Sequence, residues 1–172
     1  GFNNESHNHN DAGNFIVYLD GQPLLADAGV GEYTAKTFSS ERYDIWTMQS
    51  DYHNLPNING HMQSFGTEFR AVNFEAGEKG NSFFCKSELQ EAYPSTAGVK
   101  QFVRTVKLDK KRGRISCEEK LKFRKEGNEV VFHFLLTEKP EPGENGFRIK
   151  TKGSEKWNAW LQHLQILIQE PW

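Results

Sequence analysis

VKQFVRTVKL spans residues 99–108, KKRG spans 110–113 and RISCEEKLKF spans 114–123. Apolar and polar residues alternate in the two longer runs, which is typical of β-strands with one buried face, and KKRG predicts the turn between them. A third run covers residues 129–137 and has apolar residues on both faces, so we expect it to be a central strand. The three runs together predict an antiparallel meander.

Shorter runs of the same kind occupy much of the remaining chain. We expect strands over residues 15–19, 23–26, 43–52, 68–75 and 82–87. Asp20-Gly21 predicts a tight hairpin turn between the first two, because this pair tolerates positive φ angles. The hairpin places Asp27 at the end of its second strand. Residues 76–80 predict a turn and residues 140–146 a loop. The pattern indicates an all-β protein built as an antiparallel β-sandwich.

The C-terminal segment fits two structures. A helical stripe is formed by Trp157, Trp160, Leu161, Leu164 and Leu167, whereas residues 163–169 fit a strand equally well. We favour a short C-terminal helix.

Size and composition place the chain among ordinary folded domains. Its 172 residues suit a single β-sandwich domain over 1–172. Gly1 stands where Met would begin a complete protein, and a motif follows almost at once, so we expect a piece excised from a longer protein. Cys85 and Cys117 fall in different predicted strands, and we interpret them as small buried hydrophobes rather than a disulfide. No apolar run approaches the ~20 residues of a membrane span, and no signal peptide is recognisable.

The charges are unevenly distributed. Residues 1–60 hold two basic and eight acidic side chains, a net charge of −6, whereas residues 61–172 hold 19 basic and 15 acidic ones, a net charge of +4. An acidic N-terminal third favours a bound cation. The basic excess lies between residues 100 and 125. We interpret it as a solvated hairpin face, with a patch for acidic glycan or nucleic acid as the alternative. No nucleic-acid-binding module is recognisable.

Histidines and a carboxylate come from three segments of the first third. Residues 6–11 are SHNHND, residues 26–31 are ADAGVG and residues 52–54 are YHN. In an extended segment, His7 and His9 point to the same face because they are two positions apart. Imidazole nitrogens and a carboxylate oxygen are ligands that a divalent metal such as zinc accepts. We therefore predict a metal site formed by His9, Asp27 and His53.

Only one histidine of the first segment is needed as a ligand, which leaves the other, His7, to face a substrate as a hydrogen-bond donor or acid/base group. Candidates for orienting the imidazoles are Asn8, Asn10 and Asp11, although Asp11 also suits a turn cap. His61 is a weaker ligand candidate. We interpret His133 and His163 as packing residues.

Taken in order, these motifs resemble a known family. The stretches are SHNHNDAGNF (6–15), DGQP (20–23), DAGVG (27–31) with Tyr33-Thr34, and His53-Asn54 through Asn59-Gly60 and Gln63. In order and spacing they are similar to the β-sandwich region of heparinase II/III-like polysaccharide lyases. The resemblance implies a supersandwich-like domain that follows an N-terminal α/α toroid. It also implies cleavage of uronate-containing chains such as heparan sulfate, heparin or alginate by β-elimination.

The resemblance assigns roles to individual residues. It places a structural zinc ion on His9, Asp27 and His53, and it makes His7 the substrate-facing catalytic and substrate-binding histidine. The family's acid/base tyrosine belongs to the toroid, so we expect the isolated chain to be inactive and the toroid to be its partner. Leu55-Pro56 departs from the small or β-branched residues usual after the last ligand. The resemblance further implies an acidic polysaccharide substrate and a periplasmic or secreted location, with no nucleic-acid or membrane partner.

Two other functions remain open. The chain also suits a non-catalytic carbohydrate-binding sandwich with a structural metal, in which Trp46, Tyr52 or Trp160 stacks on sugar rings. A metallohydrolase would need a general base near the metal, for which Glu5 and Asp11 are available.

Overall fold

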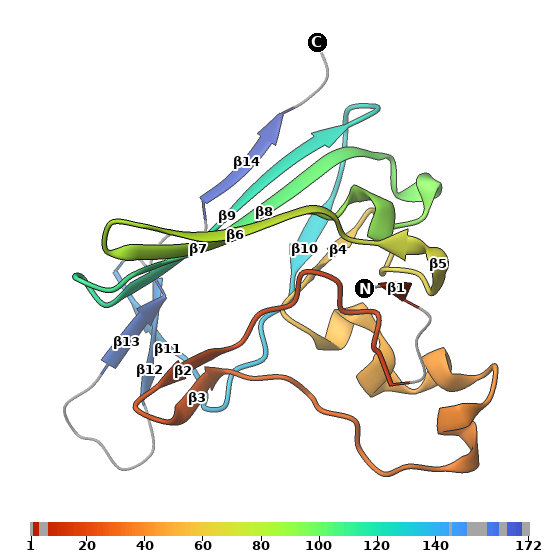
Figure 1. Ribbon diagram of the computed structural model, residues 1–172, viewed down its shortest axis with the longest axis horizontal. Helices are drawn as coiled ribbons and strands as arrows, with labels where there is room; N and C mark the ends of the chain where they lie inside the picture. The colour runs from red at the N-terminus through yellow and green to blue at the C-terminus, as the bar shows by residue number, and fades with distance from the viewer. Residues whose placement is uncertain (1, 4–6, 145, 151–157, 162–164, 170–172) are drawn as a thin grey trace.

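The computed structural model describes residues 2–3, 7–144, 146–150, 158–161 and 165–169 and consists of strands joined by loops and single-turn 3-10 helices (Figure 1). Its largest element is a five-stranded sheet ordered β14-β9-β8-β7-β6. The bounds are Val72–Lys79 for β6, Ser82–Glu88 for β7, Val99–Asp109 for β8, Arg114–Phe123 for β9 and Gln165–Gln169 for β14. Smaller antiparallel sheets complete an open, sandwich-like arrangement. The predicted all-β antiparallel fold is confirmed.

The hairpin of β8 and β9 follows the alternation of its sequence. Phe102 pairs with Leu121 and Arg104 with Glu119, and all four side chains are buried. The intervening residues Val103, Thr105 and Lys107 face the opposite side of the sheet because successive side chains alternate. Both strands and the turn between them agree with the prediction.

The third predicted strand of the meander differs from the expectation. Only Val130–Phe132 is a strand, β10, and it pairs with β4 (Pro56–Ile58) instead of β9. The free edge of β9 is taken by β14, which runs parallel to it. Beyond β10, the backbone N–H of His133 donates to Leu55 O and that of Leu135 to the side chain of Asn54, so this run follows a loop and is not a central strand.

Residues 43–52 are not a strand either. They form the 3-10 helices η2 (Arg42–Asp44), η3 (Trp46–Met48) and η4 (Ser50–Tyr52), preceded by η1 (Ala35–Phe38). Local backbone bonds such as Met48 N–H to Ile45 O close these turns. Short-range turn bonding therefore replaced the ladder pairing that the alternation suggested.

Two predicted loops also contain strands. β6 continues to Lys79, so the turn before β7 is limited to Gly80 and Asn81. The segment 140–146 includes β11 (Glu141–Gly143) and the first residue of β12 (Gly146–Lys150), which pair as a hairpin. In both places the backbone pairs as strands although the residue composition predicts a turn or loop.

The N-terminal hairpin is confirmed. β2 (Val17–Leu19) and β3 (Gln22–Leu25) pair around Asp20 and Gly21, whose φ angles are 50° and 77°. β1 (Phe2–Asn3) pairs with β5 (Gly66–Arg70).

The favoured C-terminal helix is wrong within the described residues. β13 (Asn158–Leu161) pairs with β12, and β14 lies along β9. Edge strands with unpaired backbone groups were available to accept these segments, and the β-branched Ile166 and Ile168 suit a strand. Trp157, His163 and Leu164 lie outside the described residues. Among the described residues, no helix has the length and apolar character to cross a membrane.

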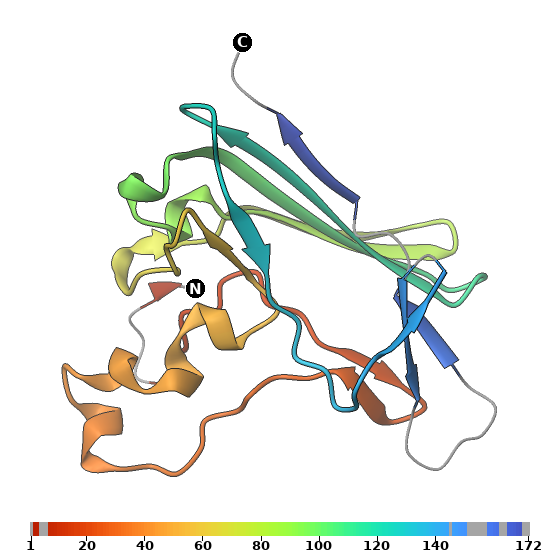
Figure 2. The ribbon, with the colours of Figure 1, turned by 180° about the vertical axis from the view of Figure 1, so that it is seen from behind.

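One face of the five-stranded sheet carries the core. Ile58, Leu89, Ala92, Tyr93, Ala97, Val99, Phe102, Leu121 and Phe123 form its main buried cluster. In both views, residues 7–65 lie on one side of this sheet (Figures 1 and 2). The free thiols of Cys85 on β7 and Cys117 on β9 lie on either side of β8, each opposite Val106, and are not disulfide-bonded, as expected. Burial raises the pKa of the Cys117 thiol, which keeps it protonated.

A buried ion pair joins the sheet to the N-terminal loops. The side chains of Arg104 and Glu119 are 2% and 0% exposed, and Arg104 Nε donates to Glu119 Oε1 at 2.8 Å. Arg104 Nη1 donates to the backbone oxygens of Gly13 and Asn54, each at 2.8 Å. Burial raises the pKa of Glu119, and the adjacent guanidinium opposes that rise. One cation therefore contacts one carboxylate oxygen and two loop carbonyls.

Replacing Arg104 with Met is expected to lower the free energy of unfolding by about 3–5 kcal/mol, because Glu119 would be left buried without its cation. Urea denaturation measures this change. Arg70→Met is the control: it removes the half-exposed Arg70–Glu91 pair and should cost about 1 kcal/mol or less. Wild-type stability in Arg104→Met would contradict the role assigned to the pair.

Candidate metal centre

His9, Asp27 and His53 meet in the folded chain. His9 lies in the loop before β2, Asp27 follows β3 by two residues and His53 directly follows η4. One potential ligand atom from each side chain lies within 4.8 Å of the other two. His9 is 7% and His53 is 0% exposed, while the Asp27 side chain is 31% exposed. The predicted ligand set is thus brought together at the edge of the interior.

The ring of His53 has an oxygen atom beside each of its nitrogens. Nδ1 lies 2.9 Å from Asp27 Oδ2, and Nε2 lies 3.1 Å from the backbone oxygen of Thr47. Nε2 also lies 3.3 Å from His9 Nδ1. A neutral imidazole carries only one N–H and can donate to only one of the two oxygens. The other nitrogen–oxygen contact is favourable only when a second proton or a metal ion lies between the nitrogen and the oxygen.

This arrangement fits a divalent cation. When Nε2–H donates to Thr47 O, the lone pair of Nδ1 faces the Asp27 carboxylate, and backbone carbonyls commonly fix the tautomer of a ligand histidine in this way. Two imidazoles and one carboxylate form a donor set that zinc accepts. An ion held there would connect three segments that share no strand pairing.

The Asp27 carboxylate is held from two directions. Asn14 Nδ2 donates to Oδ2 at 2.7 Å, and the backbone N–H of Gly29 donates to Oδ1 at 2.8 Å. Burial raises the pKa of Asp27, but the Gly29 N–H and His53 outweigh it and leave the pKa below its ordinary value. The carboxylate is therefore kept in the anionic form that binds a cation.

The environment of His9 favours its neutral form. Burial lowers the pKa of His9, and repulsion from His53 lowers it further. Neutral imidazole is the form that binds metal. Burial raises the pKa of the nearby Asp11, against the attraction of both histidines. Asp11 O accepts the backbone N–H of Asn14, which closes a turn, and its carboxylate is outside the three-residue group.

Asn54 connects the segments that hold the ligands. Its Nδ2 donates to the backbone oxygens of Phe15 and Ala26, both at 2.9 Å, and its Oδ1 accepts from Leu135 N–H at 2.8 Å. Its own N–H donates to the side chain of Asn14 at 3.0 Å. Asn54 is fully buried and out of reach of water, so these bonds supply the hydrogen-bond partners that water would otherwise provide. Sequence analysis did not identify Asn54 as a site residue, although it follows His53 directly.

A second buried cation fixes the segment between His7 and His9. Arg42 is 6% exposed and donates to the backbone oxygens of Asn8, at 2.6 Å, and Thr37, at 3.1 Å. The hydroxyl of Tyr43 donates to the side chain of Asn8 at 3.1 Å. Asn8 is therefore held by η2, and its own amide donates to His9 O instead of to an imidazole. Sequence analysis also missed Arg42, because an isolated arginine just before a strand-like run carries no site signal.

His7 is exposed and lies outside the ligand group. Its ring stands edge-on to Tyr33 and Phe38, with centroid distances of 6.3 Å to each. Tyr33 and Phe38 are themselves stacked at 5.7 Å and are more than half exposed. The ring of His7 thus faces solvent beside an aromatic pair, two residues from a buried ligand.

The remaining candidates lie apart from this group. Asn10 contacts the backbone oxygen of Gln63, not an imidazole. His61 is half-buried, and its backbone pairs with Ile58. His133 lies 3.8 Å from Asp51 and is 31% exposed, so it is not a core residue. Glu5 and His163 are outside the described residues.

Comparison with known proteins gives one family. The model of the family described as "Heparinase II/III-like, C-terminal" matches residues 2–163 of the 172. This match covers every residue of the candidate centre. A search of curated proteins found no match.

The purified chain, supplied with zinc, is expected to hold about one zinc ion, and His9→Ala and His53→Ala are each expected to lose it. Elemental analysis of protein shown to be folded by circular dichroism measures the content. His61→Ala is the matched control and should keep its zinc. A folded wild-type chain that binds no divalent metal would contradict this assignment.

Asn54→Ala is expected to lower the free energy of unfolding by about 1–3 kcal/mol, because three backbone groups lose a partner in the interior. It should also weaken zinc binding, since the Phe15, Ala26 and Leu135 segments lose their common anchor. Denaturation and zinc titration measure the two effects. Asn57→Ala, whose half-buried amide contacts only Asp51 in the described residues, is the control and should change both values little.

Proposed function

Because this chain belongs to the heparinase II/III-like family, whose C-terminal domain it represents, we propose that it is the single β-sandwich domain of a polysaccharide lyase. The proposed substrate is an acidic, uronate-containing polysaccharide, and the proposed reaction is β-elimination. The observation that carries the proposal is the exposed ring of His7 two residues from His9 in the metal-ligand cluster. A periplasmic or secreted location is part of the same proposal.

The reaction sets three chemical tasks. The carboxylate of the uronate must be neutralised, the weakly acidic proton on the adjacent carbon must be removed, and the leaving glycosidic oxygen must be protonated. An imidazole suits the first task as a hydrogen-bond donor and the second as a base. We assign His7 to the first or second task. Its exposure and its edge contacts with Tyr33 and Phe38 support this, because the ring is available to a substrate and yet held in place.

The ligand cluster has a structural role in this proposal. Zinc, when bound, would hold the side chains of His9, Asp27 and His53 together without taking part in proton transfer. The chain's own residues then fix the segments around the cluster: Arg42 binds the carbonyl of Asn8, between His7 and His9, and Asn54 binds the carbonyl of Ala26, next to Asp27. The domain would in this way form one wall of the active-site cleft.

The other wall is proposed to come from an N-terminal α/α toroid of the intact protein, which would supply the acid/base tyrosine. The described residues contain 3-10 helices of at most four residues and no toroid. We therefore propose that the isolated chain turns over little or no substrate.

In the intact lyase, His7→Ala is expected to lower kcat by about 10²–10⁴-fold, the usual contribution of an acid/base group, while zinc content stays unchanged. The absorbance of the unsaturated uronate product measures cleavage. His61→Ala is the control and should cleave at the wild-type rate. Unchanged cleavage by His7→Ala would exclude His7 from the reaction. Robust cleavage by the isolated chain would show that the toroid is not needed to supply an acid/base group.

A non-catalytic carbohydrate-binding domain is the second candidate. Trp46 and Tyr52 are 54% and 43% exposed, and their rings meet edge to face at 5.1 Å. Exposed aromatic rings of this kind stack on sugar rings. Glycan binding that is lost in Trp46→Ala but kept in His7→Ala, together with full cleavage by the intact His7→Ala protein, would favour this function.

A further inference from the structure

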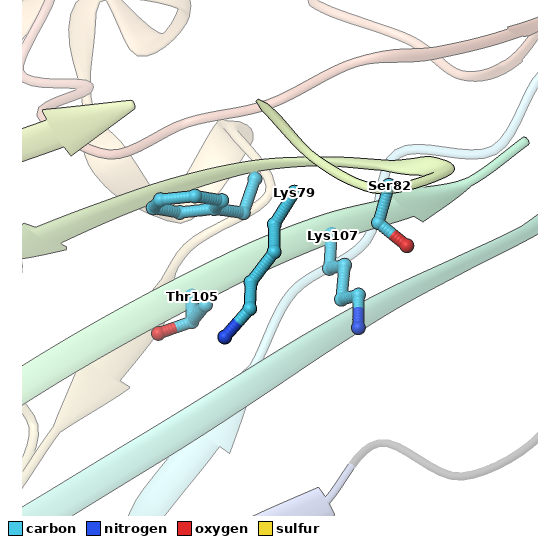
Figure 3. A pocket seen from close by; sticks show the side chains of 5 residues that line it. Lys79, Ser82, Thr105 and Lys107 are labelled. Atoms are coloured by element: carbon cyan, nitrogen blue, oxygen red, sulfur yellow. The ribbon is translucent and has the colours of Figure 1, made fainter. Parts of the chain in front are cut away.

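We propose that the face of the five-stranded sheet turned away from the metal centre carries a second binding site, which takes an acidic sugar unit. Its residues line a shallow pocket at the turn between β6 and β7: Lys79, Ser82, Phe84, Thr105 and Lys107 (Figure 3). The site lies beyond the proposed function and takes from it only the acidic polysaccharide as the choice of polymer.

Strand register places the pocket residues on one face. Lys79 pairs with Ser82 across the turn, and Phe84 pairs with Lys107 across β7 and β8. Thr105 is two positions from Lys107 on the same strand and so shares its face. Arg104, the residue directly before Thr105 on β8, points to the other face and reaches Gly13 and Asn54. The pocket and the metal centre are therefore on opposite sides of the sheet.

The pocket holds two cations without acidic partners. Lys79 and Lys107 are exposed, and neither forms an ion pair with any residue in the described part of the chain. Figure 3 shows their side chains extending in the same direction, Lys79 from β6 and Lys107 from β8, the strands on either side of β7. By contrast, Lys110, directly after β8, pairs with Glu78, and Lys120 of β9 pairs with Glu118. Two unpaired ammonium groups at one pocket suit a carboxylate or sulfate group.

Phe84 gives the pocket an apolar floor. A Cβ atom at Gly77 would lie 3.2 Å from Phe84 Cε1 and 3.3 Å from Cζ, so the missing side chain at Gly77 leaves room for the ring against β6. The half-buried ring can pack against the C–H groups of a sugar. Ser82 and Thr105 add hydroxyl groups that donate to or accept from sugar hydroxyls. An aromatic ring, two cations and two hydroxyls together match an acidic sugar better than a bare anion.

Isothermal titration calorimetry on the 172-residue chain tests the site. The probes are size-defined heparin oligosaccharides, which carry sulfate, and unsulfated uronate oligosaccharides from alginate. Lys79→Gln with Lys107→Gln is expected to weaken binding by at least about tenfold, because charged hydrogen bonds are lost. Phe84→Leu is expected to weaken it by about three- to tenfold. Comparison of the two probes identifies whether sulfate or carboxylate is the preferred anion.

Lys100→Gln with Lys125→Gln is the matched control, since both lysines are exposed and the change in net charge is the same. It should leave affinity within about twofold of wild type. The inference is overturned when neither oligosaccharide binds, or when the control pair weakens binding as much as the pocket pair. Inorganic polyphosphate is the second control. If it binds as tightly as the oligosaccharides and Phe84→Leu does not weaken its binding, the pocket is a general polyanion surface and the inference is overturned.

Asp27→Asn separates this inference from the proposed function. The variant disables the metal centre, so oligosaccharide binding that persists in it supports an independent site. Binding lost in Asp27→Asn but kept in the Lys79 and Lys107 double variant would support the metal-centre face as the glycan site and overturn the second one.

Discussion

The buried guanidinium of Arg104 is the point at which the sheet and the candidate metal centre become one structure. It neutralises Glu119 within the sheet and at the same time binds the carbonyls of Gly13 and Asn54. A buried ion pair contributes little by itself, because desolvation offsets the attraction. Here the cation also satisfies two loop carbonyls that no strand reaches. The position of the ligand-bearing loops therefore depends on a residue in the most regular part of the fold.

The candidate metal centre is built by polar groups rather than by strand pairing. Asn54 holds Phe15, Ala26 and Leu135, and Arg42 holds the backbone beside His9. Buried amide and guanidinium groups of this kind bring chain segments together only when every bond is made, since an unmade one is costly. These hydrogen bonds support the segment that carries the exposed histidine. Such a support is what a substrate-facing group requires if its ring is to keep one orientation.

Sequence analysis predicted the regular elements and the ligand set but not the support. The alternation in residues 99–123 gave β8 and β9 because both strands have one buried face, and motif spacing gave His9, Asp27 and His53. Sequence periodicity gave the wrong structure for residues 43–52, where local turn bonds replaced strand pairing. It was also wrong for residues 133–137, which run along the loop of Asn54 and bond to it. Periodicity carries no information about such long-range polar bonds. Asn54, Arg42 and Arg104 were accordingly invisible as site residues.

The bonds that fix the centre also have a consequence for the order of folding. β6 to β9 pair with sequence neighbours and need only short loops to close, whereas Arg104 meets Gly13 across 91 positions and Leu135 meets Asn54 across 81. Closing long loops costs chain entropy before any contact offsets it. We therefore expect the sheet to form before the ligand cluster. An ion held by His9, Asp27 and His53 would bind only the chain in which these long-range bonds are made, and it would slow their opening.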